Sequence, residues 1–217
     1  MADFALDLLK LTPVEDSMVM SPLSLVAALS VLESGAGGTT KNQIAEALRR
    51  KSGNDVPELI RQLAAADGVL MAVATKFYLA DSTTLHEEYN NKVSKNFDVT
   101  AERLNFRDQQ LTVQVPFIIF YFCRFVTVNS FVSDTTRGML KKLLSDDFSA
   151  PDMKAFLVNA VYFKGQWADR FSEDSTQRDV FHGIKGDREE SFMNKNKMKK
   201  CRYNVADGVD ILALPYK

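Results

Sequence analysis

The sequence predicts an α+β fold, and three observations support this prediction. Apolar residues recur at helical spacing through the first third of the chain. Residues 69–74 and 155–163 are instead apolar on both faces, as is typical of strands in a sheet that is covered on both sides. After Trp167, short strand-like segments alternate with glycine turns. Helices followed by a mixed sheet and then by further strands are the order of an α+β domain.

The first two helices follow from periodicity and from capping signals. Phe4, Leu8 and Leu11 fall on one helical face, so we expect an amphipathic helix at the N-terminus. Residues 21–22, Ser-Pro, predict the start of the second helix, because Ser can cap and Pro is tolerated in the first turn. Gly35 is expected to end that helix.

The next two helices are predicted from their first turns. Thr40 and Gln43 have the spacing of a capping box, and Pro57 indicates the start of a fourth helix. The residues expected to face inward from these helices are Ile44, Ala47, Leu48, Leu59, Ile60 and Leu63.

The rest of the chain is predicted to alternate between helices and strands. We expect helices over residues 81–96 and 128–144, with Gly138 marking a break, and a strand over 97–104. The side chains expected to be buried on these helices are Leu85, Tyr89, Val93, Phe131, Val132, Leu140 and Leu143. Four short strands are predicted near the C-terminus, over residues 180–182, 190–193, 199–203 and 209–214.

Composition limits the possible partners. The 217 residues are 46% hydrophobic and 25% charged, with a net charge of −1, so no long-range field draws nucleic acid or an anionic membrane. The longest apolar stretch, residues 116–123, is too short to span a bilayer. We therefore expect no nucleic-acid partner and no membrane partner.

The N-terminal residues bear on localisation. Asp3 and Asp7 interrupt what would otherwise be the basic start and apolar core of a secretory signal. We expect a cytoplasmic protein, and an extracellular protein without its signal is the alternative.

Signatures of catalysis are missing from the sequence. His86 and His182 lack metal-ligand spacing, and neither an H-E-x-x-H nor a G-x-S-x-G motif is present. Cys123 lies in an apolar run, where an inert buried thiol is expected rather than a nucleophile, and with Cys201 it makes too few cysteines for a disulfide scaffold. We expect no enzyme activity, no metal and no cofactor.

One basic cluster allows two interpretations. It consists of Lys195, Lys197, Lys199, Lys200 and Arg202. Alternate lysines on one strand face would attract a polyanion. The favoured interpretation is a solvated turn and a strand edge protected by lysine.

Two segments resemble the serpin superfamily of serine protease inhibitors. Residues 19–44 contain Val-Met-Ser-Pro-Leu-Ser-Leu and then Gly-Ala-Gly-Gly-Thr-Thr, similar to the second serpin helix and its following turn. Residues 157–167, Leu-Val-Asn-Ala-Val-Tyr-Phe-Lys-Gly-Gln-Trp, are similar to the third strand of the large central sheet. Weaker similarities lie at residues 128–138 and 214–216. The order and spacing of these segments agree along nearly the whole chain.

The resemblance implies a mechanism and four site residues. In an inhibitory serpin, a protease cleaves an exposed loop, which then inserts into the central sheet beside the third strand. Ser21, Ser24 and Asn159 match the shutter, where the sheet parts, and Trp167 matches the breach, where insertion begins. A polar Asn in an apolar strand must find partners or cost about 1–3 kcal/mol. We therefore expect Ser24 and Asn159 to lie close together and to be buried, although Ser21 is also an ordinary N-cap and Trp167 an ordinary core aromatic.

The resemblance also implies that residues 1–217 form an incomplete single serpin domain, in effect a truncated serpin fold. The fifth strand of the central sheet and the reactive loop have no counterpart in these residues. We expect an inhibitor of serine proteases, with cysteine proteases as a second class of target, and a fragment that is itself non-inhibitory. A non-inhibitory serpin acting in storage, as a carrier or like a chaperone is the alternative.

The segment of about residues 113–126 departs from the family. A charged amphipathic helix would run here, whereas this chain has Pro116 within a cluster of apolar and aromatic residues. Such residues are what a pyrimidine-rich tract before a splice acceptor would encode. Our hypothesis is a translated intron or an error in the gene model, and the alternative is a real insertion that packs as a buried strand or helix.

Overall fold

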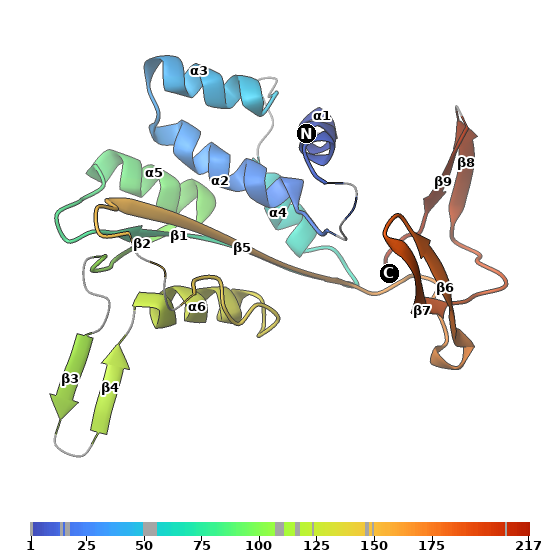
Figure 1. The fold of residues 1–217 in the computed structure, drawn as a ribbon. Coiled ribbons are helices and arrows are strands. Elements are labelled where there is room, and N and C mark those ends of the chain that lie inside the picture. Colours follow the sequence, from blue (N-terminus) through green and yellow to red (C-terminus); the bar gives the residue numbers. More distant parts are fainter. Residues whose placement is uncertain are drawn as a thin grey trace.

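The computed structural model describes residues 2–13, 15, 18–49, 56–106, 111–115, 118–122, 124–145, 148, 150–206 and 208–217. Its helices are α1 (Ala2–Lys10), α2 (Pro22–Gly35), α3 (Gly38–Ala47), α4 (Val56–Ala64), α5 (Glu87–Phe97) and α6 (Arg124–Thr135), with a short 3-10 helix at Glu173–Ser175. Its strands are β1 (Val69–Leu79), β2 (Thr100–Arg103), β3 (Leu111–Val115), β4 (Ile118–Phe122), β5 (Ala155–Gly165), β6 (Thr176–Gly183), β7 (Gly186–Met193), β8 (Arg202–Ala206) and β9 (Val209–Ala213). The α+β prediction is confirmed (Figure 1).

A three-stranded sheet in the order β2-β1-β5 forms the centre of the molecule. Strands β1 and β5 are antiparallel along their full lengths, whereas β2 runs parallel to the last residues of β1. Strand β1 continues to Leu79, five residues beyond the predicted end. Within the described part of the chain, β5 is an edge strand of this sheet.

Helices cover both faces of the sheet, α2 and α5 on one side and α6 on the other (Figure 1). Phe77 and Leu79 pack with α2 and α5 residues, whereas Tyr78 packs with α6 residues such as Val132. Alternate residues of a strand point to opposite faces, so β1 must be apolar on both. The sequence predicted this property from residues 69–74.

The capping of α2 agrees with the prediction. The buried face predicted for the N-terminal helix is only partly found. The Ser21 hydroxyl caps α2 by accepting a hydrogen bond from the Ser24 backbone N–H at 3.3 Å. Phe4 is buried, but Leu11 is 83% exposed because α1 ends at Lys10. The prediction that Leu11 shares the buried face is wrong.

The predicted starts of α3 and α4 are close but not accurate. Helix α3 begins at Gly38, so Thr40 lies inside its first turn, and the capping-box prediction is wrong. Leu48 is buried as expected, whereas Ala47 and Leu63 are exposed. Helix α4 begins at Val56, one residue before the predicted Pro57.

Left-handed residues follow the ends of α5 and α6. Helix α5 begins at Glu87, so the predicted start at residue 81 is wrong, whereas its end at Phe97 is within one residue of the prediction. Asp98 follows with a φ of 54°, and the next strand is shorter than predicted. Helix α6 ends at Thr135, and Arg137 and Gly138 have φ values of 53° and 79°. Because the chain leaves the helix there, the predicted burial of two residues beyond it is wrong; these are Leu140 and Leu143.

The other strands form three separate two-stranded hairpins, β3–β4, β6–β7 and β8–β9. Strands β6 and β7 are each longer than predicted, and β8 begins at Arg202 rather than Lys199. Hairpin β3–β4 falls in the anomalous segment, of which residues 116, 117 and 123 lie outside the described residues. Over the part of the chain that the structure describes, no helix has the length and apolar character needed to cross a membrane.

Candidate polar cluster beneath the sheet

A chain of hydrogen bonds joins α2 to the central sheet. The hydroxyl of Ser24 donates to Asn159 Oδ1, and Asn159 Nδ2 donates to Thr75 Oγ1 at 2.8 Å. Ser24 and Thr75 are buried, and Asn159 is half-buried. We call these three residues the polar cluster.

Local structure brings the three side chains together. Thr75 of β1 and Asn159 of β5 are directly opposite each other in the antiparallel register, so their side chains share one face of the sheet. Ser24 lies in the first turn of α2, which packs on that face. The expected proximity of Ser24 and Asn159 is therefore found, with Asn159 less buried than expected.

Thr75 was missed by the sequence analysis. The predicted strand ended at residue 74, so Thr75 was not placed opposite Asn159. The sequence signal for Thr75 was a hydroxyl residue that continues an otherwise apolar strand. Only the strand register shows that this residue lies opposite Asn159. The half-buried amide of Asn159 satisfies part of its hydrogen-bonding capacity through the two hydroxyls, which an apolar strand alone could not do.

Ser21 belongs to this region through its cap. Its hydroxyl oxygen contacts the backbone of Ser24 and so holds the first turn of α2 in place. Its role in the structure is therefore to orient Ser24, which in turn contacts Asn159.

Trp167 lies just beyond the end of β5, at the other end of the candidate site. Its ring is half-buried and stacks on Tyr216, with ring centroids 4.9 Å apart and an interplanar angle of 19°. The backbones of the two segments are also joined, since Ala168 N–H donates to Pro215 O at 2.9 Å. Gly165 is required beside this stack, because a Cβ there would lie 2.4 Å from the Tyr216 ring.

The basic cluster is partly neutralised within the chain. Lys195 Nζ lies 2.5 Å from Asp169 Oδ1 and donates to Arg170 O at 2.6 Å, and the Lys199 backbone N–H donates to Asp169 Oδ2 at 2.7 Å. Hydrogen bonding from the Lys195 ammonium lowers the pKa of the Asp169 carboxyl. Lys197, Lys199, Lys200 and Arg202 are exposed, but Lys199 and Lys200 precede β8, so the alternating strand face that the polyanion alternative requires is not formed.

Among the described residues, the two histidines considered for catalysis do not assemble into a site. His182 Nδ1 lies 2.8 Å from Asp187 Oδ1 on an exposed hairpin, and His86 stands at the start of α5. Among the residues that the structure describes, no three His, Cys, Asp or Glu side chains form a group that could hold a metal ion. Cys123 lies outside the described residues.

The family model described as Serpin (serine protease inhibitor) matches residues 1–217, so this chain belongs to the serpin family. Serine protease inhibitor 42Dd of Drosophila melanogaster is 26% identical over 96% of this chain and 55% of its own length. The fold resembles native AtSerpin1 of Arabidopsis, with a TM-score of 0.77, 23% identity, and coverage of 99% of this chain and 54% of that one. It also resembles native protease nexin-1 with heparin, with a TM-score of 0.78, 23% identity, and coverage of 98% and 56%.

The chain spans about half the length of the relatives it matches. Members of this family are generally inhibitors of proteases rather than catalysts. The fold and the polar cluster beneath the sheet are the features from which a function must be argued.

Proposed function

We propose that these residues are part of a serpin that traps serine proteases, with cysteine proteases as a second class of target. The observation that carries this proposal is the polar cluster, which joins α2 to the facing strands β1 and β5 through the Asn159 side chain. In the family mechanism a cleaved loop is inserted as an added strand beside the strand that β5 resembles.

The polar cluster supports the proposal by its chemistry. We propose that Ser24, Asn159 and Thr75, oriented by Ser21, act as the shutter that lets neighbouring strands separate. Hydroxyl and amide groups can exchange one hydrogen-bond partner for another as strands slide, whereas a close-packed apolar contact must be lost outright. Asn159 lies on the edge strand, so its partners would be the first to change during insertion.

We propose that Trp167 belongs to the breach, where insertion begins. The Trp167–Tyr216 stack lies at the end of β5, so it is placed to hold that end of the sheet closed. Loss of the Trp167–Tyr216 stack would let this end of the sheet open before a protease has cleaved the loop. We expect early, non-productive insertion of the loop as a result.

The test is to mix the full-length chain that carries these residues with trypsin-, chymotrypsin-, elastase- and papain-like proteases. We expect a one-to-one complex that survives denaturing electrophoresis with at least one serine protease. Residues 1–217 alone should form none, because no bait loop lies within them. A matched pair of variants, Asn159→Ala in the cluster and Asn194→Ala on the surface, tests the role of the shutter. We expect only Asn159→Ala to raise the number of inhibitor molecules consumed per protease trapped.

Two outcomes would contradict the proposal. Cleavage of the full-length chain by every protease without a stable complex would favour a non-inhibitory serpin that binds or carries another molecule. Covalent trapping by residues 1–217 alone would show that inhibition does not need a bait loop outside these residues.

A further inference from the structure

Arg137, which follows the end of α6, adopts a backbone conformation that its residue type disfavours. Its φ is 53°, and the next residue, Gly138, is also left-handed with a φ of 79°. The left-handed residue after a helix is usually glycine, because a Cβ in this conformation crowds the backbone. Such strain persists only where surrounding contacts hold it, and it gathers at parts of a fold that bind or move. The contact that the Arg137 side chain makes is therefore informative.

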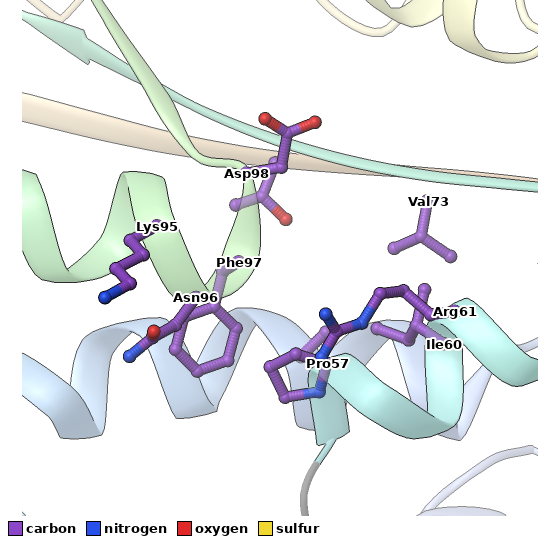
Figure 2. A pocket seen from close by; sticks show the side chains of 10 residues that line it. Pro57, Ile60, Arg61, Val73, Lys95, Asn96, Phe97 and Asp98 are labelled. Atoms are coloured by element: carbon purple, nitrogen blue, oxygen red, sulfur yellow. The ribbon is translucent and has the colours of Figure 1, made fainter.

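That contact is with strand β5. The guanidinium carbon of Arg137 lies 5.5 Å from the centroid of the Tyr162 ring, within the range of a cation–π interaction. Tyr162 lies opposite Ala72 of β1, so these two side chains share a face of the sheet. Val73 points to the other face, and Figure 2 shows it in a pocket lined by residues of α2, α4 and α5. Tyr162 therefore lies on the face that α6 covers.

Helix α6 is attached to β1 by buried contacts. The rings of Phe131 and Tyr78 meet edge to face with their centroids 6.5 Å apart. Tyr78 is fully buried, and its hydroxyl donates to the backbone oxygen of Thr127 at 3.5 Å. These contacts fix the first part of α6 to the middle strand of the sheet.

The attachment of α6 to β5 becomes weaker along the strand. Val158 and Ala160 are buried in a cluster that contains Val132 of α6. Tyr162 continues this row of side chains but is only half-buried, and the Arg137 side chain that lies over it is exposed. The last part of β5 on this face is thus held by a strained, solvent-accessible contact rather than by apolar packing.

We propose that the Arg137–Tyr162 contact, which we call the clasp, is a releasable connection that sets how readily the end of β5 moves relative to α6. The strain at Arg137 favours release, and the cation–π contact opposes it. Arg137 is a positioning residue that acts through Tyr162. The consequence for inhibition rests on the proposed function: because the loop is inserted beside β5, an open clasp should favour insertion before a protease arrives.

Hydrogen exchange of the full-length chain, followed by mass spectrometry, tests the clasp without a protease. Arg137→Gly should speed exchange over residues 161–164 about two- to fivefold, as expected for loss of an exposed cation–π contact, and leave residues 157–160 unchanged. Because glycine accepts the left-handed φ, the same variant should keep or raise the thermal midpoint. The matched control is Lys141→Gly, which removes an exposed charge from the same segment and should leave exchange in β5 unchanged.

Variants of Tyr162 identify the chemistry of the clasp. Tyr162→Phe keeps the ring face and should behave like the parent chain. Tyr162→Leu keeps an apolar side chain without that face and should reproduce the faster exchange of Arg137→Gly. In a full-length chain that traps a protease, Arg137→Gly and Tyr162→Leu should also shorten the half-life of inhibitory activity on incubation about two- to fivefold.

Three results would overturn the clasp. They are unchanged exchange over residues 161–164 in both Arg137→Gly and Tyr162→Leu, equal effects of Tyr162→Phe and Tyr162→Leu, and faster exchange throughout the chain with a lower thermal midpoint. Faster exchange with an unchanged half-life would overturn only the role of the clasp in insertion. A full-length chain that traps no protease would defeat the proposed function, while the exchange experiment would still decide the clasp.

Discussion

Asn159 is the residue whose substitution should be most informative, because it bridges two elements through one amide. Asn159→Ala removes the partner of both the Ser24 and the Thr75 hydroxyls. We expect a loss of about 1–3 kcal/mol in the free energy of unfolding of the full-length chain, measured with urea. Asn194→Ala is the control, since Asn194 is exposed and contacts only a nearby carbonyl, Phe192 O, among the bonds described; its effect should stay within about 0.5 kcal/mol. Equal effects of the two substitutions would contradict a structural role for the cluster.

Tyr78 should make stability sensitive to high pH. Burial, and secondarily the charge of Glu102, raise the pKa of its phenol to about 12. An unfolded tyrosine titrates near pH 10, so this stabilising contribution is complete below about pH 10 and is lost as the pH rises towards 12. The Tyr78→Phe variant should show a smaller loss of stability across that window, measured by urea unfolding at several pH values. Identical pH profiles for the two proteins would contradict this assignment.

Among the elements, α6 holds the segment that follows it through one side chain. Asn129 Oδ1 accepts from the backbone N–H groups of Leu143 and Leu144 at 2.7 and 2.9 Å, and its Nδ2 donates to Leu144 O at 3.0 Å. Asn129→Ala should therefore speed hydrogen exchange at the Leu143 and Leu144 amides and cost about 1–3 kcal/mol. Ser130→Ala, one residue later and exposed, is the matched control. Unchanged exchange at both amides in Asn129→Ala would contradict the proposed anchor.

The β3–β4 hairpin lies in the segment that the sequence analysis predicted to depart from the family. It pairs only with itself among the described strands, and Figure 1 shows it extending away from the central sheet. The α6 helix begins only at Arg124. We propose that about residues 113–126 are translated intron, so transcripts should show splicing that removes about this segment. Unspliced transcripts, together with peptides from this segment in the accumulated protein, would show a real insertion.

At the scale of the whole molecule, the accessible surface is too large for a compact chain of this size. It measures 15,831 Å² for 24.4 kDa, whereas a folded monomer of that mass exposes roughly 10,000 Å². The exposed side chains include large hydrophobic ones, among them Phe163 of β5 and Ile211 and Leu212 of β9. An apolar edge strand is a template for pairing with another chain.

Residues 1–217 alone should therefore self-associate or unfold, because the net stability of a domain is only about 5–15 kcal/mol. Sedimentation velocity on this fragment should show oligomers, and the full-length chain is the control. A Phe163→Lys substitution should slow the association, since a charge on an edge strand opposes pairing. A soluble monomer with a cooperative thermal transition would contradict this prediction.

How well a feature of the fold could be predicted depended on how far apart in the sequence the interacting residues lie. The start of α2 at Ser21-Pro22 was predicted correctly because an N-cap is chemistry within one turn. The end of α6 was not, because Arg137 adopts a left-handed backbone that its residue type does not require. Two members of the polar cluster came from the family motif and from the conflict between a polar amide and an apolar strand.

The sequence by itself determined the α+β class, the apolar strands of the sheet, the serpin resemblance, and the need of Asn159 for polar partners. Only the tertiary structure decided that Thr75 is one of those partners, that Lys195 is neutralised by Asp169, and that a pocket lies behind Thr75. The physical reason is that local pattern specifies which face of an element is buried, whereas register and packing decide which distant side chains meet there.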